Sequence, residues 1–209
     1  MAIPQVYKTA AEGAIASYNY TDIAEGTGIV TFYAARTQDS VASHSILTQN
    51  VVYSDIASTA VINNVGSDTW GKKIDWDFDL SPFNMPQTIG GKANISVSWQ
   101  VTTPTSGTAE GYLLFLIKKN DSFIASVATI TRGNTPVTTY EEKTSLLEVT
   151  VPKTHFKKGD VLRVTMEGWA RSGAVSDGML TVLHDPKART INTFDTSVLQ
   201  VNMPFDLDL

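Results

Sequence analysis

Three aspartates at alternate positions are the clearest group of side chains that could bind a metal ion: Asp75, Asp77 and Asp79. Hard cations such as calcium need several oxygen ligands at once. Carboxylates two residues apart on one strand lie about 7 Å apart, so a single strand cannot surround an ion. Ligands from loops would have to complete such a site, and Asp206 and Asp208 are candidates. A solvated outer face beside Lys72 and Lys73 explains the same aspartates, and we favour that interpretation.

Catalytic motifs are not found in this sequence. The histidines are His44, His155 and His184, and none stands in an HxH or HExxH pattern. There is no Gly-x-Ser-x-Gly elbow for a serine nucleophile, and Gly26-Thr27-Gly28 is too short for a phosphate-binding loop. We therefore expect surface or strand-end histidines, no catalytic, cofactor-binding or metal-ligating residue, no cofactor and no enzymatic activity.

Aromatic residues offer a second kind of chemistry, because flat rings can stack against sugars. The four tryptophans are Trp70, Trp76, Trp99 and Trp169. Trp76 and Trp99 alternate with polar residues on apolar faces, which predicts that they lie in the core. Trp70 and Trp169 are the two candidates for exposure, and they would form the platform of a carbohydrate-binding module.

Composition restricts the partners and the compartment. The formal charge is -5 with both signs scattered along the chain, whereas nucleic-acid binding needs clustered Lys and Arg. There are no cysteines, so disulfides and thiolate zinc sites are excluded. No segment is apolar enough to span a membrane, and residues 1–20 lack the basic and apolar regions of a signal peptide. We expect no nucleic-acid or membrane partner, and synthesis in a reducing cytoplasm.

The elements that must position these residues have the two-residue period of half-buried strands. The pattern is clearest in residues 72–80, where the aspartates alternate with large apolar residues, and in residues 92–103. A continuous apolar run at 111–119 indicates a central strand, and Asn120-Asp121 a hairpin turn. Further strands are expected near residues 29–35, 44–53, 123–131, 137–151, 178–184 and 197–203.

Residues 151–170 combine a strand end, a turn and a second strand. Pro152 is expected to end the first strand, because a proline cannot donate a hydrogen bond to a sheet. Lys158-Gly159-Asp160 predicts a tight turn. Residues 162–167 then alternate again. All prolines are expected at strand ends or in connections.

These patterns predict an all-β protein, an antiparallel jelly-roll sandwich of about eight to ten strands. Residues 1–28 are expected to form an N-terminal arm and residues 29–209 a single jelly-roll domain. A loosely packed terminus is the commoner outcome for such a segment. The alternative interpretation, which the assembly hypothesis uses, is an arm that docks on a neighbouring subunit.

Two stretches resemble jelly-roll virion proteins of bacterial or archaeal viruses: TFYAARTQDSVASHSILTQNVVYSDI and FKKGDVLRVTMEGWA. The Lys-Gly-Asp turn is also similar to that of the trimeric C1q and tumour-necrosis-factor class. The resemblance implies a capsid or capsid-decorating (cement) subunit that is made in the host cytoplasm and located in the virion. It further implies a homotrimer whose partners are other capsid proteins. The alternative is a carbohydrate-binding β-sandwich module, for which a host-surface glycan would be the partner.

Overall fold

The computed structural model describes residues 16–17, 27–38, 43–62, 69–103, 108–133, 135–136, 144–173, 177–189 and 197–206. Every regular element in these ranges is a β-strand, which confirms the all-β prediction. The same ranges contain no helix with the length and apolarity needed to cross a membrane.

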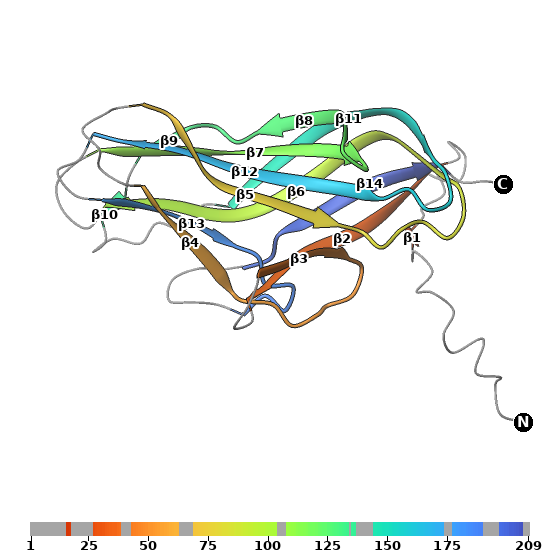
Figure 1. The fold of residues 1–209 in the computed structure, drawn as a ribbon, viewed down its shortest axis with the longest axis horizontal. Coiled ribbons are helices and arrows are strands. Elements are labelled where there is room, and N and C mark those ends of the chain that lie inside the picture. The colour runs from red at the N-terminus through yellow and green to blue at the C-terminus, as the bar shows by residue number, and fades with distance from the viewer. Residues whose placement is uncertain are drawn as a thin grey trace, which may run out of the picture.

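The strands form one elongated body, and they are labelled in Figure 1. Their bounds are β1 Ala16–Ser17, β2 Thr27–Gln38, β3 Ser43–Thr48, β4 Ala57–Ile62, β5 Gly71–Asp79, β6 Gln87–Thr103, β7 Ala109–Lys119, β8 Ser122–Ala128, β9 Arg132–Gly133, β10 Thr135–Pro136, β11 Thr144–Phe156, β12 Leu162–Ser172, β13 Gly178–Leu183 and β14 Gln200–Asp206.

Two antiparallel runs of four strands account for most of the pairing. One run has the order β2-β14-β6-β11, and the other has the order β5-β12-β7-β8. β13 and β4 continue from the C-terminal part of β6. A single parallel bridge, Ile46 to Asp79, connects β3 to β5, and β10 pairs in parallel with β6. The pairing is therefore mixed, although antiparallel pairs dominate.

The core contains inward-facing side chains from both runs. In β6, Ala93, Ile95, Val97 and Trp99 are fully buried, as their alternation predicted. Phe115 of β7 and Met166 of β12 belong to the same apolar cluster. In β5, Ile74 and Phe78 are buried while Asp75 and Asp77 face solvent. Trp99 lies in the core as predicted, and Trp76 is partly buried and packs against the core cluster.

The prediction that no proline stands inside a strand is wrong. Pro152 lies within β11 and Pro204 within β14. The β11–β6 register shifts between Val151 and Thr154, and the β14–β6 register shifts between Asn202 and Phe205. A bulge leaves a backbone group outside the ladder, so a residue without an N–H is tolerated there.

The two predicted turns are present. Asn120-Asp121 connects β7 to β8, and Asn120 adopts φ 53°. Gly159 adopts φ 91° between β11 and β12. The Asp160 carboxylate accepts hydrogen bonds from the Lys157 backbone N–H at 2.7 Å and from Asn120 Nδ2 at 3.2 Å. These contacts, together with Lys119, lower the pKa of Asp160 to about 2.

The N-terminal arm lies outside the described residues apart from two short pieces. Ala16–Ser17 pairs with Ile29 and Val30 of β2. β2 begins at Thr27, and its first residues pair with the end of β14. The idea that the arm contacts a neighbouring subunit stays a prediction.

Gly168 lies where β12 packs closely against neighbouring side chains, so a substitution there measures how tight this packing is. A Cβ atom at this position would lie 2.7 Å from Leu180 Cδ2 and 2.9 Å from Ile74 Cβ. We expect Gly168→Ala to lower the free energy of unfolding by about 1–3 kcal/mol, because the core would be overpacked. Guanidinium denaturation measures this change.

Gly133→Ala is the matched control, because a Cβ there meets nothing within 4 Å. Its effect should stay within about 0.5 kcal/mol. Equal losses for the two variants would contradict close packing at Gly168.

Candidate functional site

His184 is the centre of a buried polar cluster at the end of β13. Its ring is fully buried, with Nδ1 3.2 Å from Ser54 Oγ and Nε2 2.9 Å from Ser58 Oγ. Arg36 Nη1 donates to Ser58 Oγ at 3.1 Å, which leaves the Ser58 hydroxyl hydrogen for Nε2. The network thus assigns the ring proton to Nδ1. His184 directly follows β13, in agreement with the expectation of surface or strand-end histidines, but its ring is buried, whereas His155 is exposed.

The cluster keeps His184 neutral. Burial is the main cause that lowers its pKa, to about 4, and the nearby Arg36 guanidinium adds to this effect. Arg36 lies over the Trp76 ring at 4.1 Å, and the His184 ring meets the edge of the same indole at 5.6 Å. Trp76 therefore closes the cluster on the side of β5.

A buried carboxylate lies beside this cluster without orienting the imidazole. Asp185 accepts hydrogen bonds from the Lys187 N–H at 3.0 Å and from Arg189 Nε at 2.6 Å. Arg189 also donates to the Ser54 carbonyl. In a catalytic triad the carboxylate would bind the histidine and the serine would face substrate. Here Ser54, His184 and Asp185 are all fully buried, so the cluster fastens the β3–β4 connection to the end of β13.

Two protein cations, Lys72 and Arg163, form ion pairs with the row of three aspartates, Asp75, Asp77 and Asp79. Arg163 of β12 binds Asp79 through Nε at 2.6 Å and Nη2 at 2.8 Å, and Nη1 lies 2.6 Å from Asp121 Oδ1. These carboxylates raise the pKa of Arg163, with the Asp79 hydrogen bonds contributing most. Thr165 donates to Asp77. Within the described ranges, no group of three or more metal-ligating side chains is suited to an ion.

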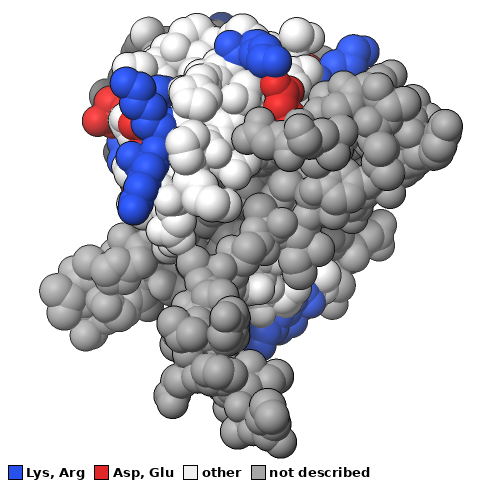
Figure 2. All heavy atoms as spheres, turned by 90° about the vertical axis from the view of Figure 1, so that its right-hand side faces the viewer, with Lys and Arg blue, Asp and Glu red and all other residues white. Residues whose placement is uncertain are grey.

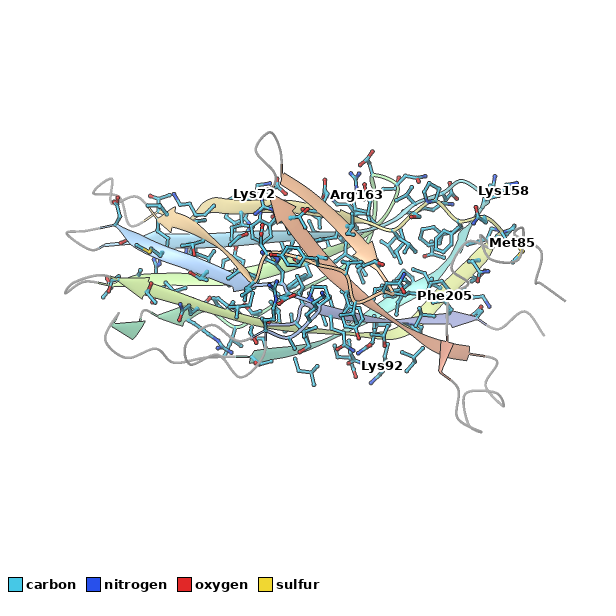
Figure 3. All side chains as sticks on the ribbon, turned by 90° about the horizontal axis from the view of Figure 1, so that it is seen from below. Lys72, Met85, Lys92, Lys158, Arg163 and Phe205 are labelled. Atoms are coloured by element: carbon cyan, nitrogen blue, oxygen red, sulfur yellow. The ribbon has the colours of Figure 1, made fainter. Side chains whose placement is uncertain are left out.

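Lys72 forms ion pairs at the other end of the row of aspartates. It binds Asp75 at 2.6 Å and Glu167 at 3.1 Å. Lys72 and Arg163 mark separate points along this face in Figure 3. Asp206, considered as a further ligand, pairs with Lys153 at 2.6 Å instead, and Asp208 lies outside the described residues. The structure thus supports the outer-face interpretation of the aspartates.

Three aromatic residues gather on the outer side of β5, β12 and β7, and we call them the aromatic row: Trp70, Tyr112 and Trp169. The Trp70 and Tyr112 ring centroids are 5.1 Å apart, and the parallel Tyr112 and Trp169 rings are 6.4 Å apart. All three side chains are partly exposed. Tyr112 and Trp169 are directly opposite each other in the β7–β12 ladder. Tyr112 contacts both candidate tryptophans, Trp70 and Trp169, and the sequence analysis did not single it out.

Charged side chains surround the aromatic row. Arg171 lies 5.0 Å from the Trp70 ring and binds Glu110 at 2.6 Å. Trp169 Nε1 donates to Glu167 Oε2 at 2.8 Å. The two-residue alternation of β12 could have predicted this surface from the sequence, because Glu167, Trp169 and Arg171 occupy successive outward positions of the strand.

Among the described residues, Lys and Arg side chains form no continuous band at the end of the molecule shown in Figure 2. Described Lys and Arg side chains stand there in separate groups with uncharged atoms between them. Among the described lysines, Lys92 pairs with Glu148 at 2.8 Å and Lys119 pairs with Asp160 at 2.9 Å.

Comparisons with protein families and with curated proteins find no match to this sequence. Solved structures do match. A CocE/NonD family hydrolase from Staphylococcus aureus is 13% identical with a TM-score of 0.52, and an aminopeptidase from a marine sediment Thaumarchaeota archaeon is 6% identical with a TM-score of 0.53. Each match covers 87% of this chain and 37% of the other chain.

The expectation that the chain is not an enzyme is contradicted by these matches, because a hydrolase and an aminopeptidase contain the same fold. At this identity the likeness shows the fold alone. The infectious bursal disease virus structure (Gx strain) also matches, with 10% identity over 80% of this chain and 40% of that chain. Its TM-score of 0.30 is too low to support a conclusion.

The buried histidine predicts a specific dependence of stability on pH. The pKa of His184 is about 4 in the folded protein and 6.5 without perturbation, so the unfolded chain takes up the proton first as the pH falls. The free energy of unfolding should lose about 3 kcal/mol from this group between pH 6.5 and pH 4, with its full contribution present above pH 6.5. Urea denaturation at a series of pH values measures the loss.

His184→Gln is the control, because the amide keeps a donor and an acceptor but does not titrate. Its stability should change less over the same pH interval. Identical pH profiles for the native chain and the variant would contradict this assignment.

Proposed function

We propose that this chain is a jelly-roll subunit of a virion shell, a capsid or capsid-decorating protein that acts through contacts between subunits. The observation that carries the proposal is the strand order. Two runs, β2-β14-β6-β11 and β5-β12-β7-β8, together contain eight strands, the number that a jelly roll requires, and this supports the proposal. Viral capsid proteins are among the proteins built on this architecture.

The path of the chain between the runs supports the same interpretation. β5 belongs to one run, β6 to the other, and β7 and β8 to the first again. The chain then crosses to β11, returns to β12 through the Gly159 turn, and reaches β14 in the opposite run. Such alternation is what two interleaved Greek keys require.

One edge of the body is suited to contact with another subunit. β8 and β11 end the two runs and lie side by side (Figure 1). Among the described pairings, β8 pairs only with β7 and β11 only with β6. An edge strand presents unpaired N–H and C=O groups that can bind another chain.

Apolar side chains at this edge remain uncovered in the single chain. Ile130 is 75% exposed and Leu146 is 74% exposed. Ile130 follows β8 and Leu146 lies on β11, and a hydrogen bond from Arg132 Nη2 to Ser145 Oγ at 3.0 Å links the two segments. An interface of standard size, about 1,600 Å² in total, would cover both residues. The assembly that we propose is a homotrimer that binds other capsid proteins in the virion.

Acidic substitutions at the edge test this function. We expect the native chain to form a multimer of the 22.7 kDa subunit, and the double variant Ile130→Glu, Leu146→Glu to be mainly monomeric, since buried carboxylates repel and lose solvation. Light scattering coupled to size-exclusion chromatography gives the mass of each species.

Met85→Glu is the matched control. Met85 is 66% exposed in the β5–β6 connection, beside Lys158 in Figure 3. This connection lies at the C-terminal end of β11, where Phe156 pairs with Gln87, whereas Leu146 lies near the opposite end of that strand. This variant should assemble like the native chain. A native chain that stays monomeric at every concentration would overturn the proposal.

Removal of residues 1–26 tests the arm separately and leaves β2 intact, because β2 begins at Thr27. We expect the shortened chain to unfold at a similar denaturant concentration but to assemble more weakly. Sedimentation velocity compares the two chains. Equal assembly would exclude a role for the arm.

A further inference from the structure

We propose that the aromatic row, Trp70, Tyr112 and Trp169, binds a neutral saccharide on the outer face of the β5-β12-β7 sheet. This binding site is additional to the shell role and does not depend on it. A virion subunit with such a surface would attach to uncharged glycans.

The position of the row is the first argument. Gly111 and Leu113, on either side of Tyr112, are buried, and Gly168 and Ala170, on either side of Trp169, are buried as well. Tyr112 and Trp169 therefore point away from the core. Aromatic rings on a solvent-facing side of a sheet leave apolar surface in water. The apolar C–H face of a pyranose ring is complementary to such a surface.

The spacing of the rings is the second argument. Tyr112 and Trp169 are parallel within 3° with centroids 6.4 Å apart, which gives two similarly oriented ring surfaces on adjacent strands. Trp70 is tilted by 59° to Tyr112 and already has the Arg171 guanidinium over it at 5.0 Å. We therefore assign stacking to Tyr112 and Trp169, with Trp70 as the lateral wall.

The surrounding charges favour a neutral ligand. Two cations and three carboxylates stand around the row: Lys72, Arg171, Asp75, Glu110 and Glu167. Each cation is bound to a carboxylate, at 2.6 Å in the Arg171–Glu110 pair and 2.6 Å in the Lys72–Asp75 pair. An anionic ligand would meet a slight excess of negative charge, which disfavours phosphate and sulfated glycans.

The same groups supply hydrogen bonds for sugar hydroxyls. A carboxylate has about four acceptor positions on its two oxygens. The Glu167 oxygens receive Trp169 Nε1 and Lys72 Nζ, and Arg171 contacts Glu110 through both Nε and Nη2. These contacts hold the side chains in place before a ligand arrives, so little conformational entropy is lost on binding.

The strands below the row are rigidly packed. A Cβ at Gly111 would lie 2.9 Å from Val101 Cγ2, and a Cβ at Gly168 would lie 2.7 Å from Leu180 Cδ2. The backbone beneath Tyr112 and Trp169 is therefore in close contact with the opposite layer. A surface supported in this way keeps its geometry without a ligand.

Isothermal titration calorimetry on the full chain tests the proposal. The probes are neutral oligosaccharides of glucose, mannose, galactose and N-acetylglucosamine, with heparin as the anionic probe and a chitosan oligomer as the cationic one. We expect binding to at least one neutral probe. Trp169→Ala and Tyr112→Ala should each weaken it by about tenfold or more.

Phe123→Ala is the matched aromatic control, because Phe123 is 62% exposed on β8 and belongs to no ring pair of the row. It should bind like the native chain. Trp70→Ala, which changes a residue outside the strand ladders, gives a second reading if Trp169→Ala fails to fold; circular dichroism checks each variant.

Three results would overturn the proposal. One is the absence of heat with every neutral probe, and another is binding only to heparin or chitosan. The third is a native multimer that becomes monomeric on Trp169→Ala, which would show that a second copy of the chain covers the row. Because the edge variants at Ile130 and Leu146 are measured by mass and the row by titration, failure of either proposal leaves the other testable.

Discussion

Burial of the inner side chains of β6 against those of β7 and β12 is the interaction on which the rest of the structure depends. These residues belong to one apolar cluster that includes Trp99, Phe115 and Met166. Trp99 also connects β11 and β9 to this core. Its Nε1 donates a hydrogen bond to Ser145 Oγ of β11 at 3.0 Å, and the Arg132 guanidinium of β9 lies over its ring at 5.1 Å. Where the layers approach most closely, at Gly111 and Gly168, only glycine leaves room. The free energy of folding is thus supplied from inside the body, because buried apolar area dominates stability.

Once the core is fixed, the outer surfaces can carry different functions. Along β5 and β12, carboxylates are matched by Arg163 and Lys72. This network is largely exposed, and exposed ion pairs contribute little to stability. The aromatic row continues the same face, while the edge of β8 and β11 leaves backbone groups and two apolar side chains uncovered. A rigid body with a distinct face and a distinct edge is suited to assembly on one side and ligand binding on another.

Sequence reasoning was most successful where a local pattern decides the structure. The two-residue alternation placed Trp99 inside and Asp75 outside, and the turn at Gly159 followed from residue type.

Prediction from the sequence failed where contacts join distant segments. The burial of His184 at its strand end is not indicated by nearby residues, because its partners Ser54 and Ser58 are 130 and 126 residues away. Tyr112 joined the row through strand register, which a single sequence does not specify. Pro152 lies inside a strand because a bulge accommodates it. The likeness in fold to a hydrolase and an aminopeptidase is not indicated by the sequence, because the identities are only 13% and 6%.

The central claim is that the β8 and β11 edge is completed by another subunit. Amide hydrogen exchange of the native chain, at high and low protein concentration, tests it most directly. The account predicts that amides of β8 and β11 exchange more slowly at high concentration, because a second chain pairs with their free edge, while amides of β14, which lies between β2 and β6, do not change. Exchange at β8 and β11 that is the same at every concentration would contradict it.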